Sequence, residues 1–324
     1  MRKTNAFALM AAAACMLAAC NKENVNDNGG EEPDPTPKNV VVYACGNVGK
    51  DSGYYWKDGV GTQLNCLKTQ HFPMGKSIFV VGDDVYVAGY ELKTAVVWKN
   101  CEPTALTDGT YDAAANGVAV IGKDVYVAGV DNSTVMLWKN GEGTALTGKA
   151  QAGKAESLFA DGNDIYISGY CNSKATIWKN GEPTYLTTEN TDANAYSVYV
   201  DNGNVYACGC IDSEAAVWKN GELTLLTDDW NYAIARGVCA KGNDVYVTGT
   251  DGTNPVFWKN GEMSVLATCE GFGSGYGIAV KGDDVYITGI VDNASVIWKN
   301  GQILYELANA TTGTSCFGLF VTEE

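Results

Sequence analysis

The sequence predicts an all-β protein, a seven-bladed β-propeller with four-stranded antiparallel blades. An octet, VMLWKNGE at residues 135–142, recurs along the chain, and its tryptophan returns every 40 residues from Trp98 onward, after a first interval of 42. Each repeat also contains four short apolar runs. A fixed period of this length is typical of stacked repeat architectures, and the octet occurs seven times, with tryptophans Trp56, Trp98, Trp138, Trp178, Trp218, Trp258 and Trp298.

One unit, residues 116–155, shows the expected strands in order: GVAV, DVYVAG, VMLWK and GTALT. The runs are rich in Val, Ile, Tyr and Thr and are bounded by turn residues, which favours strands. Gly-Lys joins the first two runs and Asn-Gly joins the last two. Both pairs are signatures of two-residue hairpins, because the primed turns require positive φ. The octet is therefore predicted to be a strand, its tight turn and the start of the return strand.

The runs are almost continuously apolar, as in AVVW at 95–98 and DVYVAG at 124–129. Such strands bury both faces, so the four-stranded sheets must stack against one another, as the blades of a propeller do. Residues 40–46 match the second strand of a unit and residues 317–321 match the first. We expect the last strand to complete the first blade and to leave no free sheet edge. Deleting residues 315–324 should then unfold far more than a tail.

The first 38 residues are expected to lie outside the propeller. Residues 1–19 have the basic start and the apolar run of a signal peptide, and the run is too short to span a membrane as a helix. Leu17-Ala18-Ala19-Cys20 resembles the lipobox of bacterial lipoproteins, which implies cleavage before Cys20 and lipid attachment to its sulfur. The alternative is an ordinary signal peptide with a chance cysteine. Residues 20–38 form a polar, acidic segment that predicts a disordered tether, similar to the export signals of Bacteroidetes surface lipoproteins. The propeller is expected over residues 39–324.

The charge of the chain excludes one class of partner. Without Arg2 and Lys3, 20 basic residues stand against 38 acidic ones, which gives a net charge of −18. Nucleic-acid binding through the overall field requires a basic footprint, so no nucleic acid is expected. Contact with the membrane is expected through the lipid on Cys20 only.

The cysteines and the single histidine limit metal and catalytic chemistry. Nine cysteines follow Cys20, none of them in a CxxC pair, and His71 is the only histidine, so neither a metal site nor another cofactor is expected. A histidine-dependent catalytic triad would have to use His71 in the least regular blade. One disulfide, between Cys45 and Cys316, is conceivable if Cys316 lies diagonally across the closing hairpin, although diagonal neighbours are at the edge of disulfide reach.

The strand pair GIAVKGDDVYITG (277–289) is similar to bacterial propeller repeats of the SBBP type, and the pattern A..xW.NG…L resembles extracellular HAF repeats. Both families are defined by fold-level repeats, so the resemblance implies the propeller and transfers no site residues.

The candidate site lies at the variable end of the strands. The turns Gly-Asp-Asp and Lys-Asn-Gly barely change between units, whereas the loop after the second strand and the crossover to the next blade change freely. Loops on a rigid scaffold are where binding usually resides. Aromatic faces stack on sugars or on peptide side chains, and polar neighbours fix orientation. The candidate ligand-binding residues are Trp230, Tyr232, Arg236, Tyr276, Tyr196, Tyr111, Phe272, Glu156 and Lys76.

These observations predict a binding module for a glycan or a protein, anchored by lipid to the outer membrane and exposed at the cell surface. One alternative is a polysaccharide-active lyase or hydrolase at the channel mouth, using Glu156, Lys76 and Tyr196. Another is a scaffold on the periplasmic face, resembling the propeller lipoprotein of outer-membrane protein assembly. No residue is assigned a catalytic role.

Overall fold

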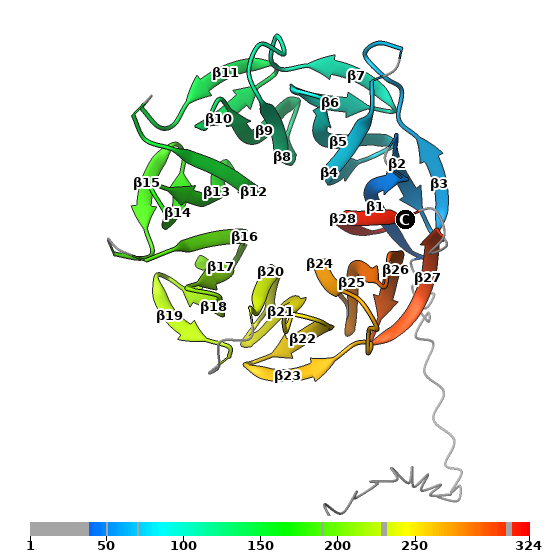
Figure 1. The fold of residues 1–324 in the computed structure, drawn as a ribbon, viewed down its shortest axis with the longest axis vertical. Helices are drawn as coiled ribbons and strands as arrows, with labels where there is room; N and C mark the ends of the chain where they lie inside the picture. The colour runs from blue at the N-terminus through cyan, green and yellow to red at the C-terminus, as the bar shows by residue number, and fades with distance from the viewer. Residues whose placement is uncertain are drawn as a thin grey trace, which may run out of the picture. The chain divides into compact units, whose positions relative to one another are not determined.

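The computed structural model describes residues 39–324 except 50, 70, 149, 189–190, 228–231 and 309–312. Its strands form seven four-stranded antiparallel sheets, arranged as blades around a central channel (Figure 1). This arrangement confirms the predicted seven-bladed propeller. The expected signal peptide, Cys20 and the tether lie outside the described residues. In the part of the chain that is described, no helix is long and apolar enough to cross a membrane.

The four strands of each blade follow one another from the channel outward. Blade 1 consists of β28 (Thr314–Glu323), β1 (Val40–Val48), β2 (Ser52–Lys57) and β3 (Val60–Gln63). Blade 2 consists of β4 (Pro73–Val81), β5 (Asp84–Glu91), β6 (Thr94–Lys99) and β7 (Glu102–Ala105). Blade 3 consists of β8 (Ala113–Ile121), β9 (Asp124–Asp131), β10 (Thr134–Lys139) and β11 (Glu142–Ala145). Blade 4 consists of β12 (Gly153–Asp161), β13 (Asp164–Cys171), β14 (Lys174–Lys179) and β15 (Glu182–Tyr185).

The remaining blades repeat this order. Blade 5 consists of β16 (Ala193–Asp201), β17 (Asn204–Ile211), β18 (Glu214–Lys219) and β19 (Glu222–Leu225). Blade 6 consists of β20 (Ile234–Lys241), β21 (Asp244–Thr250), β22 (Pro255–Lys259) and β23 (Glu262–Val265). Blade 7 consists of β24 (Gly273–Lys281), β25 (Asp284–Val291), β26 (Ala294–Lys299) and β27 (Gln302–Ala308).

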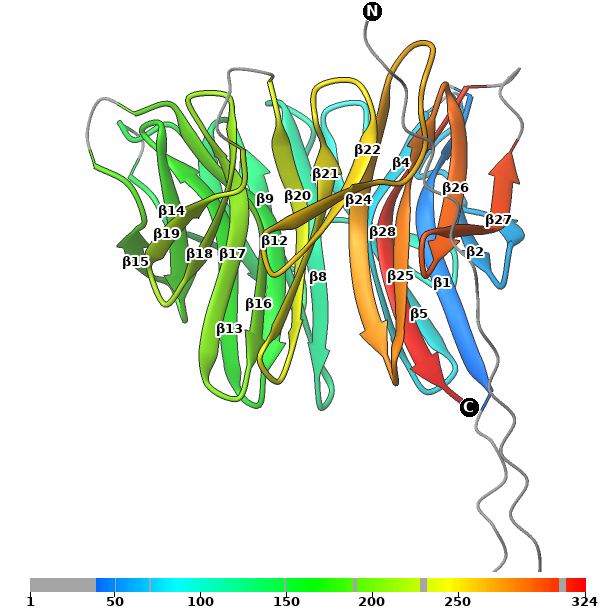
Figure 2. The same ribbon diagram turned by 90° about the horizontal axis from the view of Figure 1, so that it is seen from below.

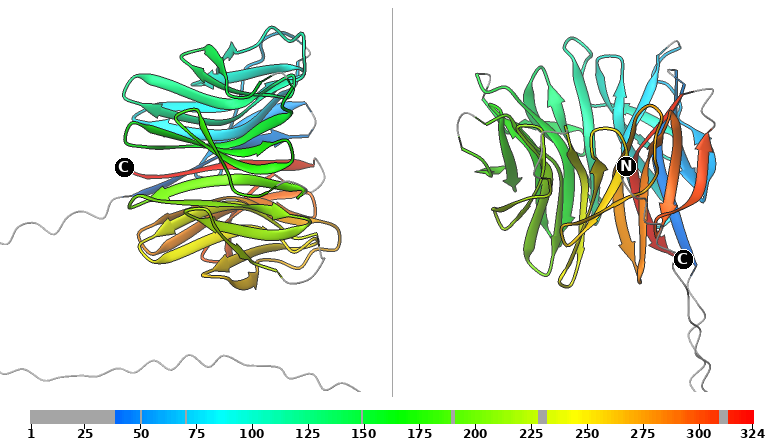
Figure 3. Two further views of the ribbon diagram at one scale, coloured as in Figure 1. Left: turned by 90° about the vertical axis from the view of Figure 1, so that its left-hand side faces the viewer. Right: turned by 60° about the horizontal axis from the view of Figure 1, so that its bottom comes forward.

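The last strand closes the ring. β28 pairs antiparallel with β1 from Val40↔Glu323 to Val48↔Thr314, and both views of Figure 3 show it, in red, ending at the C-terminus. The C-terminal strand therefore belongs to the same sheet as the first strand, as the sequence predicts. This pairing joins the two ends of the propeller by main-chain hydrogen bonds, so that β1 is paired on both sides, with β28 and with β2.

The repeated tryptophan seals the interface between neighbouring blades. All seven tryptophans of the octet are at most 2% exposed. Trp98 of blade 2, for example, packs with Val41, Tyr43 and Cys45 of blade 1, and Trp56 of blade 1 packs with Ile297 of blade 7. Burial of a large aromatic side chain is among the largest single contributions to a core. One tryptophan per blade therefore accounts for the 40-residue period.

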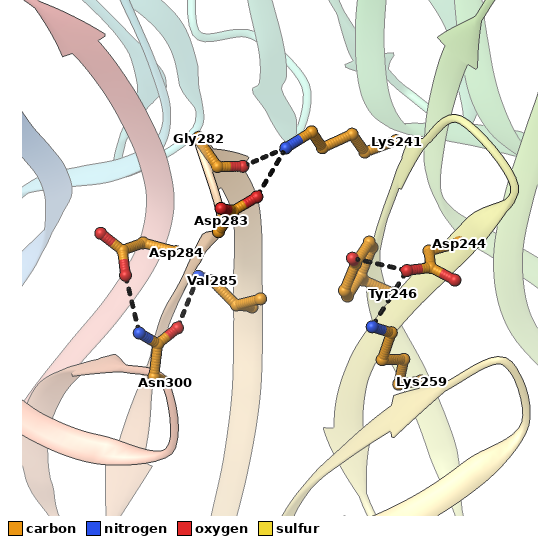
Figure 4. A network of polar contacts seen from close by, with 9 residues as sticks. All are labelled: Lys241, Asp244, Tyr246, Lys259, Gly282, Asp283, Asp284, Val285 and Asn300. Atoms are coloured by element: carbon orange, nitrogen blue, oxygen red, sulfur yellow. Dashed lines mark hydrogen bonds and ion pairs between the residues drawn. The ribbon is translucent and has the colours of Figure 1, made fainter. Parts of the chain in front are cut away.

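The tight turns at one end of the strands carry a repeated polar network (Figure 4). In blade 7, Asn300 accepts a hydrogen bond from the Val285 amide at 2.9 Å and donates one to Asp284 at 2.7 Å. A backbone amide donates to the turn residue in the same way in every blade. The lysine before the turn also lies over a tyrosine ring in each blade, at 5.1–5.5 Å.

The backbone explains why Asn-Gly recurs at these turns. Asn140 and Gly141 both have positive φ, 52° and 88°, as a primed two-residue turn requires. We call this end of the strands, with its Lys-Asn-Gly and Gly-Asp turns, the turn end. The arrowheads of β24 and β28 point toward it at the lower edge of Figure 2. The opposite end, where the crossovers from blade to blade enter the inner strands, is the crossover end.

The structure does not support the disulfide between Cys45 and Cys316. Both are free thiols. Gly318 lies opposite Cys45 as expected, but the register shifts there and Cys316 pairs with Gly46. Cys45 packs toward blade 2 and Cys316 toward blade 7, so the side chains lie on opposite faces of blade 1. The expectation was wrong because one extra residue, Phe317, reverses the facing of the strand.

Candidate functional site

Every inner strand contains a β-bulge at the same place, near the crossover end. In β4, for example, Gly75 pairs with Gly89 and Ser77 pairs with Ala88, so Lys76 is an extra residue without a partner. A bulge turns the side chain of the extra residue away from the normal alternation of the strand. The bulged residues of blades 1 to 7 are Phe317, Lys76, Asn116, Glu156, Tyr196, Arg236 and Tyr276.

A glycine of the second strand makes room for each bulge. An added Cβ on Gly249 would lie 1.9 Å from the carbonyl oxygen of Ile234, two residues before Arg236. The same close approach occurs in every blade, so any side chain at this position would collide with the bulged backbone. The equivalent glycines are Gly46, Gly89, Gly129, Gly169, Gly209, Gly249 and Gly289. The recurrent glycine of VYVAG is thus required by the bulge.

The seven bulged residues line one cavity of about 550 Å³ in the channel. This volume is within the range of small-ligand pockets. Five of the bulged residues, Lys76, Glu156, Tyr196, Arg236 and Tyr276, are candidate residues from the sequence, and the structure brings them together with Asn116 and Phe317. Since the backbone is the same in each blade, the cavity can present seven side chains, of six residue types, in fixed positions. We call this part of the channel the mouth.

Aromatic rings and cations alternate along one side of the mouth. The Lys76 ammonium lies 3.7 Å from the centre of the Phe317 ring, which is in edge contact with Tyr276 at 5.0 Å. The Arg236 guanidinium lies between two tyrosine rings, 5.2 Å from the centre of Tyr276 and 5.4 Å from that of Tyr196. These rings hold the guanidinium without occupying its hydrogen-bond donors.

The other side of the mouth is polar and internally paired. Glu156 forms an ion pair with Lys154 at 2.9 Å and accepts a hydrogen bond from Asn194 at 3.0 Å. Asn116 donates to the carbonyl of Ala155 at 2.8 Å. The one carboxylate among the residues that line the cavity is therefore already compensated by a cation of its own blade.

Arg236 and Lys76 have no such compensation among the described residues. No carboxylate of that part of the chain forms an ion pair with either of them. The Nε of Arg236 is also buried without a hydrogen-bond partner there. Buried donors are normally paired, and an unpaired one requires an explanation.

Burial in the mouth shifts the acid–base behaviour of its side chains. Desolvation, together with the nearby charge of Lys154, lowers the pKa of Lys76 to about 8. Desolvation raises the pKa of Tyr196 to about 12 and also raises the pKa of Tyr276. Both tyrosines are therefore neutral hydrogen-bonding groups at physiological pH, while Lys76 is mostly protonated at pH 7.

A second, smaller cavity of about 350 Å³ lies beside the mouth. Tyr196 lines both cavities, so the two are adjacent. The remaining walls combine aromatic rings with short polar side chains, namely Tyr170, Ser173, Asp192, Asn194, Ser213 and Tyr232. The side chain of Tyr232 is 74% exposed and its φ is 56°, so this residue stands at the rim.

The predicted site residues divide into three groups. Lys76, Glu156, Tyr196, Arg236 and Tyr276 share the mouth, and Tyr232 belongs to the second cavity. Tyr111 and Phe272 are exposed on crossovers, at 55% and 42%, and line neither cavity. Trp230 lies outside the described residues.

Two polar residues of the site were not predicted from the sequence. Lys154 and Asn194 each lie two positions before a bulged residue, and both contact Glu156. Their signal is positional: in other units the same place holds an apolar or small side chain, such as Met74, Ala114, Ile234 or Ser274. A polar residue where sister units carry a nonpolar one marks a local departure from the repeat.

Neither a metal cluster nor a histidine-based catalytic site is evident in the described chain. Its residues include no group of three or more His, Cys, Asp or Glu side chains that could hold a metal ion. His71 contacts Glu91, at 3.2 Å, and Glu91 also accepts from the Leu67 amide. Both Glu91 oxygens thus help to order the longer connection between blades 1 and 2, away from the mouth.

Comparisons with known proteins identify the fold and no family. No family model matches the chain, and no curated protein does. The computationally designed Ika8 protein is similar in structure, with a TM-score of 0.51 and 17% identity over 85% of this chain and 96% of that one. The extracellular domain of a protein described as a hybrid two component system of B. thetaiotaomicron gives a TM-score of 0.52 at 10% identity, over 85% of this chain and 38% of that one. At these identities the likeness establishes that the chain has a β-propeller fold.

Proposed function

We propose that the propeller is a binding module of the cell envelope that takes a glycan or a protein segment into its mouth. The observation that carries this proposal is the set of seven bulges, which turns seven side chains of six residue types into one cavity while the backbone stays constant. Blade stacking does not require unlike residues at these positions, because the buried strand faces are served by the repeated apolar residues. Bulges commonly re-aim side chains at binding and catalytic sites.

The composition of the mouth favours a glycan over a flat protein surface. The bulged residues alone contribute three aromatic rings, two cations and a paired carboxylate to a concave site. Aromatic faces stack on sugar rings, and a few polar groups fix their orientation. In the proposed setting the chain is anchored through a lipid on Cys20 and faces the cell exterior. Protease accessibility of the propeller on intact cells would distinguish this orientation from a periplasmic scaffold.

The first test is a glycan array probed with residues 21–324, which contain the whole closed ring. We expect binding that is lost in Tyr196→Ala, because Tyr196 lines both cavities. The matched control is Tyr185→Ala, an exposed tyrosine on the outermost strand β15. Loss in both variants, or in neither, would contradict a site at the mouth. If no glycan on the array binds and a protein is captured by crosslinking through the mouth, the protein ligand would be favoured.

A polysaccharide-active enzyme is the second candidate, and one observation favours it. Lys76, with its pKa of about 8, lines the same cavity as Glu156 and Tyr196. A lysine near its pKa at working pH can exchange protons with a substrate. Shortening of a polysaccharide by the wild type, and its absence in Lys76→Met, would support the enzyme.

A further inference from the structure

We infer that the ligand of the mouth is an acidic oligosaccharide, whose anionic group binds between Arg236 and Lys76 and whose chain extends into the second cavity. This inference rests on the proposed function and names the class of glycan. It is carried by three features of the described residues: the uncompensated cations, their position in an otherwise acidic protein, and the second cavity.

The net charge of the mouth is positive, whereas the net charge of the whole chain is negative. The whole sequence has a net charge of −16, yet the charged residues that line the cavity are Lys76, Lys154, Arg236 and Glu156. Since Lys154 pairs with Glu156, two positive charges remain. A cleft lined by one sign of charge focuses the potential on a ligand of the other sign. The mouth therefore attracts an anion that the rest of the surface repels.

The two cations are held in place at an energetic disadvantage. A cation over an aromatic ring gains a modest stabilisation, whereas partial removal of a charge from water is unfavourable unless the charge is paired. The Nε of Arg236 is buried without an acceptor in the described part of the chain. A carboxylate or a sulfate group supplies the missing acceptors, because its oxygens match the planar fork of the guanidinium.

The aromatic rings favour a sugar as the carrier of the anionic group. Tyr196 and Tyr276 flank the guanidinium, and Phe317 lies next to Lys76. A ligand oxyanion bound to Arg236 would therefore lie close to aromatic rings, on which a sugar ring can stack.

The second cavity indicates more than one sugar unit. Tyr196 forms part of both cavities, so a ligand anchored at Arg236 can continue past this ring without leaving the surface. The walls beyond it carry hydroxyl, amide and carboxylate groups, with the exposed ring of Tyr232 at the rim. Asp192 in this cavity disfavours a second anionic group there, which places a neutral sugar unit beside the acidic one.

The test is isothermal titration of residues 21–324 with two series of oligosaccharides, one carrying uronic acids and one carrying sulfate esters. Each series is compared with its neutral counterpart, made by carboxyl reduction or desulfation. We expect one acidic series to bind, and removal of the charge or Arg236→Gln to weaken binding by about thirtyfold or more, equivalent to about 2 kcal/mol. Which series binds identifies the anionic group.

Matched variants separate the mouth from the rest of the surface. Lys241→Gln removes a cation at the other end of the strand that carries Arg236, where Lys241 contacts Asp283, and it should leave the affinity unchanged. Arg236→Lys keeps the charge without the fork and should fall between wild type and Arg236→Gln. Tyr232→Ala should weaken the binding of tetrasaccharides and leave the binding of disaccharides unchanged. Tyr111 is an exposed tyrosine outside both cavities, so Tyr111→Ala should affect neither.

Three results would overturn the inference. Equal affinity for acidic and neutral saccharides would make the mouth a neutral lectin site, which leaves the proposed function standing. Binding of polyglutamate in preference to every saccharide, with the same loss in Arg236→Gln, would keep the anion site and assign it to a protein. Absence of binding by all acidic saccharides, with the melting temperature of each variant unchanged, would also contradict the inference.

Discussion

The turn end and the mouth lie at opposite ends of the same inner strands, and they differ in how strictly the repeat is kept. At the turn end, a side chain of the turn accepts a backbone amide hydrogen bond in all seven blades. At the mouth, the backbone is equally regular but the bulged residue differs: Phe, Lys, Asn, Glu, Tyr, Arg and Tyr. One end repeats its chemistry and the other repeats only its geometry.

This difference shows how a repeat protein can vary a site without losing its fold. The hydrogen bonds of the turns and the buried tryptophans are supplied blade by blade, so the fold does not require a particular side chain at the bulge. The glycine opposite each bulge preserves the backbone path. Consequently the bulged position accepts charged, polar and aromatic residues alike, and a binding site can arise from positions that stability leaves free.

The largest effect is expected where the backbone of the mouth itself is disturbed. Gly249→Ala places a Cβ against the carbonyl of Ile234, at 1.9 Å in the present geometry, so the bulge that presents Arg236 must shift. We expect a loss of about 3 kcal/mol in the free energy of unfolding, as for an overpacked core, together with loss of ligand binding. Denaturant unfolding and titration measure the two effects.

The control for this variant is Gly242→Ala at the turn end. Gly242 has a φ of 62°, and a Cβ added there would meet no atom within 4 Å, so alanine there meets only the strain of the left-handed region, about 1 kcal/mol. Binding should be retained. An equal loss of stability in both alanine variants would refute the role assigned to the glycine opposite the bulge.

A smaller loss is expected from the polar network at the turn end. Asn260→Ala removes the acceptor for the Val245 amide and the donor to Asp244, and alanine is strained at a φ of 53°. We expect a decrease of about 2 kcal/mol in the free energy of unfolding. Asn260→Gly, which tolerates this φ, should lose about half as much. Chemical denaturation separates the hydrogen bonds from the strain; a neutral outcome for both variants would show that water replaces the network.

At the mouth, removal of a charged side chain is expected to increase the free energy of unfolding. The pKa of Lys76 is about 8, below its ordinary value of 10.5, so between these values the unfolded chain binds a proton that the folded chain does not. The destabilisation is complete below pH 8 and disappears as the pH rises toward 10.5. Lys76→Met should therefore raise the free energy of unfolding at pH 7 by about 1 kcal/mol, a figure reduced for the partial exposure of Lys76. The gain should vanish by pH 10.5, the ordinary pKa of lysine; a loss of stability at pH 7 would contradict a destabilising charge at this position.

The smallest effect is expected from adding to blade 5 an ion pair that most of the other blades have at the turn end. Blade 5 has Asn204 where blades 2, 3, 4, 6 and 7 have an aspartate that pairs with the turn lysine, as Asp244 pairs with Lys259. Asn204→Asp should add an exposed ion pair with Lys219 and stabilise by about 0.3 kcal/mol at low salt. This stabilisation should decrease in high salt. Thermal melts of both proteins at low and high ionic strength measure it, and equal melting temperatures at low salt would contradict the prediction.

The sequence predicts the fold because the information is repeated. Seven octets, their hairpin turns and the two half-units at the ends define the blade number and the closure. Lys76 and Arg236 were candidates because they lie at the variable end of the units, and both line the mouth. The bulge did not, since a single extra residue leaves the apolar pattern intact and shows only as a recurrent glycine on the neighbouring strand. The disulfide expectation failed for this reason, because Phe317 places Cys45 and Cys316 on opposite faces.

The side-chain contacts within the mouth also could not be predicted from the sequence. The compensation of Glu156 by Lys154, and the lack of any such partner for Arg236 among the described residues, depend on side-chain directions that the bulges set. Tyr111 and Phe272 are exposed on crossovers, and their residue type alone did not reveal that neither lines a cavity.

The most direct test measures stability and affinity together in two variants of blade 6, Arg236→Gln at the mouth and Asn260→Ala at the turn end. We expect Arg236→Gln to lose affinity for an acidic oligosaccharide while its free energy of unfolding stays unchanged or rises. We expect Asn260→Ala to lose stability while its affinity stays unchanged. If both variants lost affinity and stability in parallel, binding and stability would not be divided between the two ends of the strands, and the distinction drawn between them would be contradicted.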